Sequence, residues 1–223
     1  MTMIRIKPGR FIMGSPEAEV GHASQNGRFS DETQGPQRLT QPFYLAKTEI
    51  TQLQWQAVMG SNPSPIKAAN LPVDHVSWRD AQAFIARLNA KHLAPKGWQF
   101  ALPSEIQWEY ACRAGARGPY GGHSLEDIGW YRDNSGGRTH EVALKAPNRW
   151  GLHDMHGNVS EWCLDQYSSK TSASAAAAHA HRVFRGGFWD LDAAGCRAAY
   201  RNGAHPDCRD DELGLRPALV GAP

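Results

Sequence analysis

The spacing of hydrophobic side chains predicts helices in the first half of the chain. Residues 78–91 carry apolar side chains at intervals of three and four positions, so one face of a helix is hydrophobic. The residues of that face are Ala81, Phe84, Ile85 and Leu88. Residues 105–114 repeat the pattern with Ile106, Tyr110 and Ala114. Both segments are therefore expected to be helices that pack one face on a core.

Three hydroxyl residues carry the signals that start a helix. Thr51 and Ser104 are each followed three residues later by glutamine, and Ser77 is followed by Asp80. In such a capping box the hydroxyl accepts a hydrogen bond from a backbone N–H of the first turn, and the later side chain binds the N–H of the capping residue. An acidic residue in the first turn also suits the positive end of the helix dipole. Helices are thus predicted to begin directly after these three residues.

Short strands and irregular stretches make up the rest. Strands are predicted at 10–14, 42–47, 98–102, 181–185 and 213–219. Residues 115–160 show little periodicity, and so long an irregular stretch inside a compact domain usually needs a tie such as a bound metal ion. The Ser- and Ala-rich segment 171–180 indicates a surface loop, with a helical turn as the alternative. These elements predict one α+β domain over residues 1–223, rich in loops, with short strands and two to three helices.

Composition and charge exclude several classes of protein. The 223 residues are 41% hydrophobic and 21% charged, which is typical of a folded domain. A net charge of +2 without a dense Lys/Arg stripe argues against nucleic acid as a partner. No stretch approaches 18 apolar residues and the first residues lack the apolar core of a signal peptide, so no membrane partner is expected and a cytoplasmic location is the default.

The four cysteines do not form a recognisable framework. Four thiols in a chain of this length are too few for a disulfide scaffold, and none shows the CxxC spacing of a zinc site. They are Cys112, Cys163, Cys196 and Cys208. Reduced structural thiols are the prediction.

Sequence blocks spread over almost the whole chain resemble one known family. They are FIMGSP at 11–16, PFYLAKTEIT at 42–51, ALPSEIQWEYACRAG at 101–115, and NRWGLHDMHGNVSEW at 148–162 followed by RVFRGGFW at 182–189. Together they resemble the sulfatase-modifying-factor family, which includes formylglycine-generating enzymes and the variable proteins of diversity-generating retroelements. The resemblance implies a C-type-lectin-like fold. It does not determine function, because one fold hosts several unrelated activities.

The resemblance allows a test for the oxidase chemistry of the family. In formylglycine-generating enzymes a Ser follows Arg-Gly-Gly directly, and two Cys further on hold copper(I), which suits soft sulfur ligands. Here Phe188 takes the place of the Ser, Leu191 that of the first Cys, and Cys196 that of the second. One thiolate cannot supply a two-sulfur site unless Cys208 folds back to join it. We therefore expect no copper, no formylglycine formation, and no catalytic residues, with Cys196 a buried structural thiol.

The segment 153–161 carries candidate ligands for metals other than copper. His153 and His156 lie three residues apart in a loop and could chelate iron, although solvated or turn-capping histidines are the commoner case. The resemblance implies a structural calcium site in which Asp154 and Glu161 give side-chain oxygens, while Gly157 and Val159 give backbone carbonyls. Two carboxylates around a Gly-Asn turn are hard ligands for a hard cation. In the alternative interpretation Asp154 forms a turn and Glu161 starts a helix or makes a salt bridge.

The last block of the chain resembles the variable region of a retroelement variable protein. A skeleton of arginines (Arg197, Arg201, Arg209), Pro206 and the segment 214–216 is expected to hold the fold by binding loop carbonyls. Between these residues lie side chains of mixed type that suit adaptable recognition. The candidate ligand-binding residues are Trp189, Asp190, Leu191, Asp192, Tyr200, Asn202, His205, Asp207, Asp210 and Asp211.

Two functions follow as alternatives. In the first, the domain is a non-catalytic scaffold that presents residues 188–212 to a protein or glycan ligand. In the second, it is an accessory oxidase or maturation enzyme of the sulfatase-modifying-factor family that acts on a small molecule or peptide in the same groove. The oligomeric state is left open by both.

Overall fold

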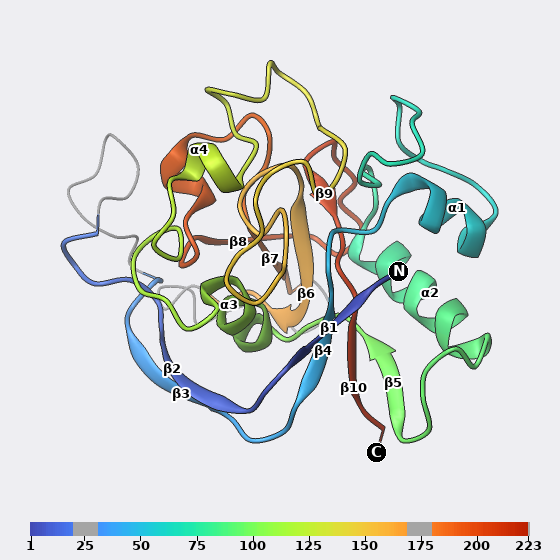
Figure 1. The fold of residues 1–223 in the computed structure, drawn as a ribbon. Coiled ribbons are helices and arrows are strands. Elements are labelled where there is room, and N and C mark those ends of the chain that lie inside the picture. The colour runs from blue at the N-terminus through green and yellow to red at the C-terminus, as the bar shows by residue number, and fades with distance from the viewer. Residues whose placement is uncertain (20–30, 169–179, 223) are drawn as a thin grey trace.

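Three small sheets and a set of short helices form the domain in the computed structural model, which describes residues 1–19, 31–168 and 180–222 (Figure 1). The first sheet is antiparallel, with strands in the order β1-β4-β10-β5. Its strands are β1 (Met3–Ile6), β4 (Phe43–Ala46), β10 (Ala218–Gly221) and β5 (Trp98–Ala101). The last strand in sequence therefore lies inside the sheet, between strands that precede it by more than 100 residues.

The other two sheets surround the irregular part of the chain. A hairpin of β2 (Gly9–Met13) and β3 (Gly35–Leu39) curves along one side of the molecule (Figure 1). The third sheet has the order β8-β7-β6-β9, with a parallel pairing between its last two strands. Its strands are β6 (Ser160–Gln166), β7 (Arg182–Arg185), β8 (Arg201–Ala204) and β9 (Leu213–Gly214).

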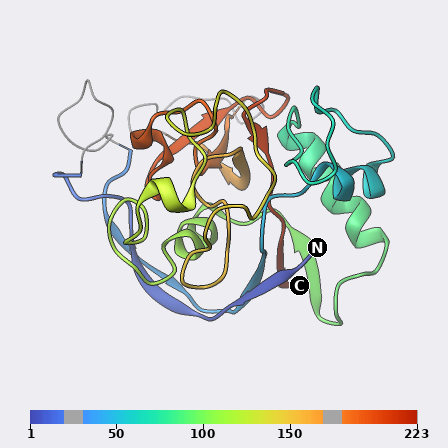
Figure 2. The ribbon, with the colours of Figure 1, turned by 45° about the horizontal axis from the view of Figure 1, so that its top comes forward.

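All three predicted helices are confirmed, and each begins at its capping box. These helices are α1 (Gln52–Met59), α2 (Trp78–Ala90) and α3 (Glu105–Arg113). Both hydrogen bonds of the box form at Thr51, Ser77 and Ser104, and caps of this kind stabilise a helix by about 1 kcal/mol each. In both views α1 and α2 lie together, on the side of the molecule away from the β2–β3 hairpin (Figure 2). No helix in the described part of the chain is long and apolar enough to cross a bilayer.

The strand predictions are confirmed for four segments and need correction elsewhere. The segments 10–14, 42–47, 98–102 and 181–185 match β2, β4, β5 and β7. The predicted strand 213–219 is two strands, β9 and β10, in two different sheets. β1, β3, β6 and β8 were not predicted. Glu161 lies inside β6 and pairs with Arg216, so the salt bridge of the alternative interpretation is confirmed and the helix start is wrong. The predicted loop 171–180 lies almost entirely outside the described residues.

Two apolar clusters build the core around the sheets. One contains the α1–α2 pair, where Trp55 and Phe84 stack with ring centroids 5.2 Å apart, and it extends to Trp162 on β6. The other surrounds Trp108 of α3, which is fully buried beside Phe43 of β4. Since a large aromatic side chain contributes 150–250 Å² of buried surface, these tryptophans account for much of the core of a chain with short elements.

Buried asparagine side chains tie down the irregular stretch between α3 and β6. The Asn148 amide donates to the carbonyl oxygen of Ala111 and accepts from the backbone N–H of Trp150 and Leu152. Asn158 exchanges two hydrogen bonds with the backbone of His140. A side chain that satisfies several buried backbone groups at once replaces the ladder that a strand would supply. The predicted need for a tie is thus met in part by these amides.

Candidate ligand-binding surface

The segment 188–212 alternates between anchored and accessible positions. After β7 the chain turns, forms a short 3-10 helix (η2, Ala193–Cys196), runs through β8 and reaches β9 by a loop. The skeleton residues Arg197 and Pro206 are buried. All ten predicted binding residues, by contrast, are at least partly exposed, and the most exposed of them are Asp190, Asp207, Asp210 and Asp211. The backbone is therefore held from below while these side chains reach the surface.

Arg197 anchors the middle of this segment. Its guanidinium binds both carboxylate oxygens of Glu32, at 2.7 and 2.8 Å, and one oxygen of Glu19 at 3.0 Å. Glu32 is almost fully buried, so the pairing leaves neither charge uncompensated. Asp192, at the start of η2, accepts a hydrogen bond from the N–H of Gly195. These contacts set the direction of the chain on either side of Cys196.

A second group of arginines holds the backbone that follows. Arg185 of β7 is fully buried, pairs with Glu109, and donates to the carbonyl oxygens of Ala198 and Ala199 at 2.9 and 3.0 Å. Arg201 binds both oxygens of Glu105, each at 2.7 Å. Arg197 and Arg201 hold the fold as predicted, but chiefly through carboxylates instead of the predicted loop carbonyls, whereas Arg209 is exposed and pairs with Asp80. Arg185, which was not predicted, binds two loop carbonyls. Bidentate arginine–carboxylate pairs fix orientation as well as position, so the scaffold beneath the surface is rigid.

The structure divides the ten predicted residues into three groups. Trp189, Asp190, Leu191 and Asp192 surround the turn after β7, where the Arg132 side chain donates to the Asp190 carbonyl oxygen at 3.0 Å. Tyr200 and Asn202 lie on or next to β8, with the Asn202 amide 3.3 Å from the Tyr200 hydroxyl. His205, Asp207, Asp210 and Asp211 belong to the loop before β9. Each group offers a different chemistry on one segment.

The loop before β9 is strongly acidic, and one of its carboxylates was not predicted. Burial, together with the charges of Asp210 and Asp211, raises the pKa of Glu212 to about 7. The pKa of Asp211 is raised by burial and by Asp210. Asp207 is partly neutralised by Arg79 at 2.8 Å, and no described basic side chain pairs with Glu212. This end of the segment is therefore a patch of negative charge, and within it the pKa of Glu212 lies near neutral pH.

Cys196 is a buried thiol whose sulfur lies 4.0 Å from the Phe188 carbonyl oxygen. Burial raises the pKa of the Cys196 thiol to about 12, with Asp192 as a second cause. The Leu191 side chain packs so closely over Gly195 that an added Cβ there would lie 2.2 Å from it. Cys208 packs against the α1–α2 core cluster, and all four cysteines are free thiols. No three Asp, Glu, His or Cys side chains gather in metal-binding geometry among the described residues.

Cys112 and His156 form a buried contact that resembles a catalytic pair but lacks its chemistry. The Cys112 Sγ lies 3.5 Å from His156 Nε2, and His156 Nδ1 is 2.8 Å from the Cys196 carbonyl oxygen. Burial raises the pKa of Cys112 to about 12 and lowers that of His156 to about 4. Both are neutral at physiological pH, so no thiolate is present to act as a nucleophile. His153 binds the Lys145 carbonyl oxygen instead of pointing to a site shared with His156.

The predicted calcium ligands lie in a buried polar cluster, in which one carboxylate could bind a cation directly and the other is already paired with an arginine. Asp154 Oδ2 accepts from the Ala143 N–H at 2.7 Å, whereas Oδ1 has no partner among the described residues. Gly157 is held against the Trp130 carbonyl oxygen, at a φ of +82° that suits glycine. Both oxygens of Glu161 are already bound by Arg216, and one also accepts from Trp108. Asp154 can serve a cation as it stands, but Glu161 cannot without leaving its arginine.

Glu49 is the member of this cluster that sequence reasoning missed. It is buried, and neither of its carboxylate oxygens makes a well-formed hydrogen bond with the described residues, although the Val159 backbone N–H lies close enough to favour the ionised form. Burial raises its pKa well above the usual value, and the nearby Asp154 raises it further. The only sequence signal was the acidic residue two positions before the Thr51 cap, which carries no information about burial.

One family model and one solved structure match nearly the whole chain. The family model described as the sulfatase-modifying factor enzyme 1-like domain matches residues 1–220. The structure of Treponema denticola variable protein 1 superposes with a TM-score of 0.83 at 27% identity, over 97% of this chain and 94% of that one. The formylglycine-generating enzyme of Streptomyces coelicolor is 33% identical over 74% of this chain and 57% of its own length. The inactive C-alpha-formylglycine-generating enzyme 2 of Bos taurus is 31% identical over 74% of this chain and 55% of that protein.

Proposed function

Because this chain belongs to the family of the sulfatase-modifying factor enzyme 1-like domain, we propose that it keeps the family scaffold and uses it to bind a ligand without covalent chemistry. The ligand is a protein or a glycan, and the binding residues are the ten predicted side chains of the segment 188–212, all of them at least partly exposed. The chain covers only about half of the enzymes it resembles, so their reactions are not carried over to it.

One observation carries this proposal above all. The turn after β7 bears Phe188 and Leu191, so apolar side chains stand where a redox site of this family would need polar and sulfur ligands. The same turn is braced by Arg185 and Arg197, whose guanidinium groups pair with the buried carboxylates of Glu109 and Glu32. A rigid backbone that displays mixed side chains binds with little loss of conformational freedom. The similarity to Treponema denticola variable protein 1 supports the same interpretation.

The proposal is tested by a screen on glycan and peptide arrays. Ligands that the protein retains should be lost by a variant in which Asp190, Leu191 and Tyr200 are replaced by alanine. A matched control, Arg138→Ala, changes an exposed residue outside the segment and should keep them. Binders that survive the triple substitution would show that the segment is not the ligand-binding surface.

The second candidate, an accessory oxidase, is favoured by the 33% identity to the formylglycine-generating enzyme of Streptomyces coelicolor. It predicts binding of copper(I) or iron(II) and consumption of oxygen by the metal-loaded protein. The scaffold proposal predicts neither. Oxygen uptake that scales with bound metal, and that stops when Cys196 is replaced by serine, would decide for the oxidase.

A further inference from the structure

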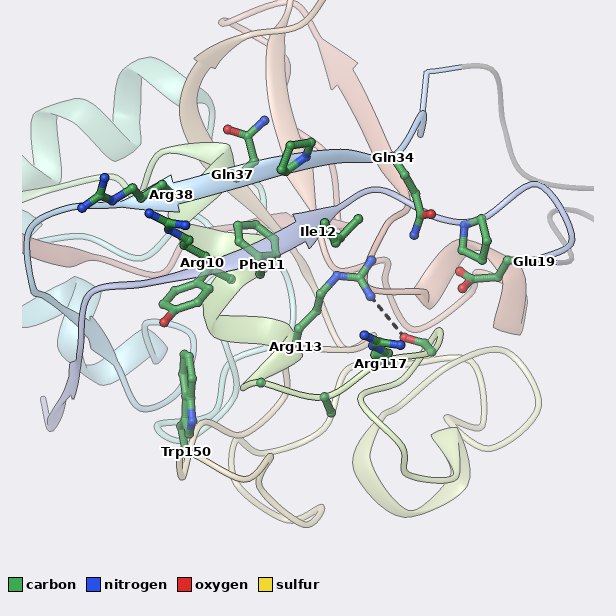
Figure 3. Close-up of a pocket in the computed structure, with 16 residues that line it drawn as sticks. Arg10, Phe11, Ile12, Glu19, Gln34, Gln37, Arg38, Arg113, Arg117 and Trp150 are labelled. Atoms are coloured by element: carbon green, nitrogen blue, oxygen red, sulfur yellow. Dashed lines mark hydrogen bonds between the residues drawn. The ribbon is translucent and has the colours of Figure 1, made fainter.

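A large cavity lies away from the segment 188–212. It measures about 1040 Å³ and opens between the β2–β3 hairpin, the end of α3, the turn at 115–118 and Trp150 (Figure 3). None of the residues that line it belongs to 188–212. Its volume is at the upper end of the range for small-molecule sites, so it has room for several residues of an extended peptide.

Aromatic rings form the apolar wall of this cavity. Phe11 of β2 and Tyr110 of α3 have ring centroids 5.3 Å apart, and Tyr110 meets Trp150 edge-on at 4.9 Å. Tyr110 is buried, while Ile12 at the rim is half exposed. Tilted and edge-on packing of this kind holds the rings in place without further contacts. The wall is therefore a preformed surface on which an apolar side chain can pack.

Three arginines at the cavity have no acidic partner. Arg10 and Arg38 are directly opposite each other across the β2–β3 hairpin, and Arg117 follows α3. All acidic residues of the chain fall within the described residues, and none of them forms an ion pair with these three arginines. Like charges directly opposite on two strands destabilise a hairpin. An anion bound between Arg10 and Arg38 would reduce the repulsion between their charges.

The other charged side chains that line the cavity already have hydrogen-bond or ion-pair partners. Arg113 donates to Glu109 at 2.8 Å and to the carbonyl oxygens of Gly14 and Gly118. Glu19 is paired with Arg197 at 3.0 Å. Neither group is free to neutralise the three open arginines. The cavity therefore carries net positive charge beside an aromatic wall.

The arrangement of the charges selects among anionic ligands. Arg10 and Arg38 lie together on the hairpin, whereas Arg117 lies apart from them, near Arg113 (Figure 3). A single phosphate bound by Arg10 and Arg38 would leave Arg117 without an anion, whereas a ligand with several spaced carboxylates can engage all three. We propose that the cavity binds an acidic peptide segment of a partner protein, with carboxylates on the arginines and an aromatic or aliphatic side chain on the Phe11–Tyr110–Trp150 wall.

The test uses the full chain and a fluorescein-labelled peptide, Glu-Glu-Phe-Glu-Glu-Tyr, with binding followed by anisotropy at low salt. The double variant R10E/R38E should weaken binding at least ten-fold, and W150A at least three-fold. The control R138E changes an exposed arginine outside the cavity and should stay within two-fold of the original. The peptide with glutamine in place of glutamate should not bind. Affinity should fall as salt rises, because the contacts are solvent-exposed ion pairs.

Several outcomes would overturn the proposal. Equal binding by R10E/R38E, with thermal unfolding unchanged, would remove the arginines from the site. Tighter binding of a six-nucleotide oligothymidine than of the peptide would assign the cavity to nucleic acid, and competition by millimolar inorganic phosphate would assign it to small anions. The result is independent of the proposed function, since the triple alanine variant in 188–212 should bind this peptide as well as the original chain does.

Discussion

Arg216 holds Glu161 through both carboxylate oxygens in the interior of the protein, at distances of 2.7 to 2.9 Å. Both side chains are fully buried. The same guanidinium also donates to the carbonyl oxygens of Ala46 and His153, so it joins the first sheet, the irregular stretch and β6. Two further buried carboxylates, Glu49 and Asp154, lie close enough for their charges to act on Arg216. The Arg216 guanidinium therefore interacts electrostatically with three buried carboxyl groups.

Replacing this cation should damage the fold more than replacing its partner. Arg216→Met leaves the buried carboxylate of Glu161 without its cationic partner, and we expect a loss of about 3–5 kcal/mol in the free energy of unfolding. Glu161→Gln should cost less, because Glu49 can ionise beside the freed arginine. Urea titration measures both. Arg132→Met, at an exposed pair with Asp190, is the control and should cost less than about 1 kcal/mol. A larger loss for Glu161→Gln than for Arg216→Met would contradict this account.

The calcium hypothesis makes a separate prediction for the same cluster. If a cation binds Asp154 and its neighbours, chelator should lower the melting temperature and added calcium should restore it, since a ligand that binds only the folded state stabilises it. Asp154→Ala should abolish the response to chelator. Calorimetry with and without chelator measures the effect. A melting temperature that ignores chelator in the original chain would leave the stretch held by Asn148, Asn158 and other protein contacts alone.

The acidic loop before β9 should make stability depend on pH. The pKa of Glu212 is raised to about 7, so the folded state holds this proton more tightly than the unfolded chain does. Stability should therefore fall as pH rises from about 4.5 to about 7. Glu212→Gln should raise the melting temperature at pH 8, by about 2–4 °C for each kcal/mol regained, and leave it unchanged at pH 4. Asp133→Asn, at an exposed aspartate elsewhere, should show no such difference between the two pH values.

A pair of glycines separates backbone strain from close contact. A Cβ on Gly157 would lie 2.0 Å from the Trp130 carbonyl oxygen at a φ of +82°, whereas one on Gly136, at +63°, would meet no atom within 4 Å. Gly136→Ala should cost about 1–2 kcal/mol for the left-handed backbone alone. Gly157→Ala should cost roughly 2–5 kcal/mol because overpacking is added. Equal losses in urea titration would mean that the contact with Trp130 relaxes freely.

What the sequence predicted well was local in origin. A capping box spans four residues, so the sequence around Thr51, Ser77 and Ser104 predicts a helix start without information from the rest of the chain. The exposure of the ten side chains in 188–212 also follows a local signal, because most of them are polar or charged.

What it missed depends on contacts between distant residues. β3 reads GPQRL, which has no strand pattern, and it becomes a strand by pairing with β2. Arg197 pairs with Glu32, which is 165 positions away in the sequence, and Arg185 pairs with Glu109, which is 76 positions away. Nothing near an arginine in sequence says which carboxylate it will meet. The cavity lined by Phe11, Tyr110 and Trp150 could not be predicted for the same reason.

The interior position of β10 has a consequence for how the domain is made. A ribosome releases β4 and β5 well before β10, yet these two strands touch each other only through it. During synthesis both therefore expose unpaired backbone edges, which are templates for association between nascent chains. The sheet closes when residues 218–221 slide in between, and Ala46 then donates to the Pro217 carbonyl oxygen. The sheet can therefore be completed only after residues 218–221 have been synthesised and have left the ribosome.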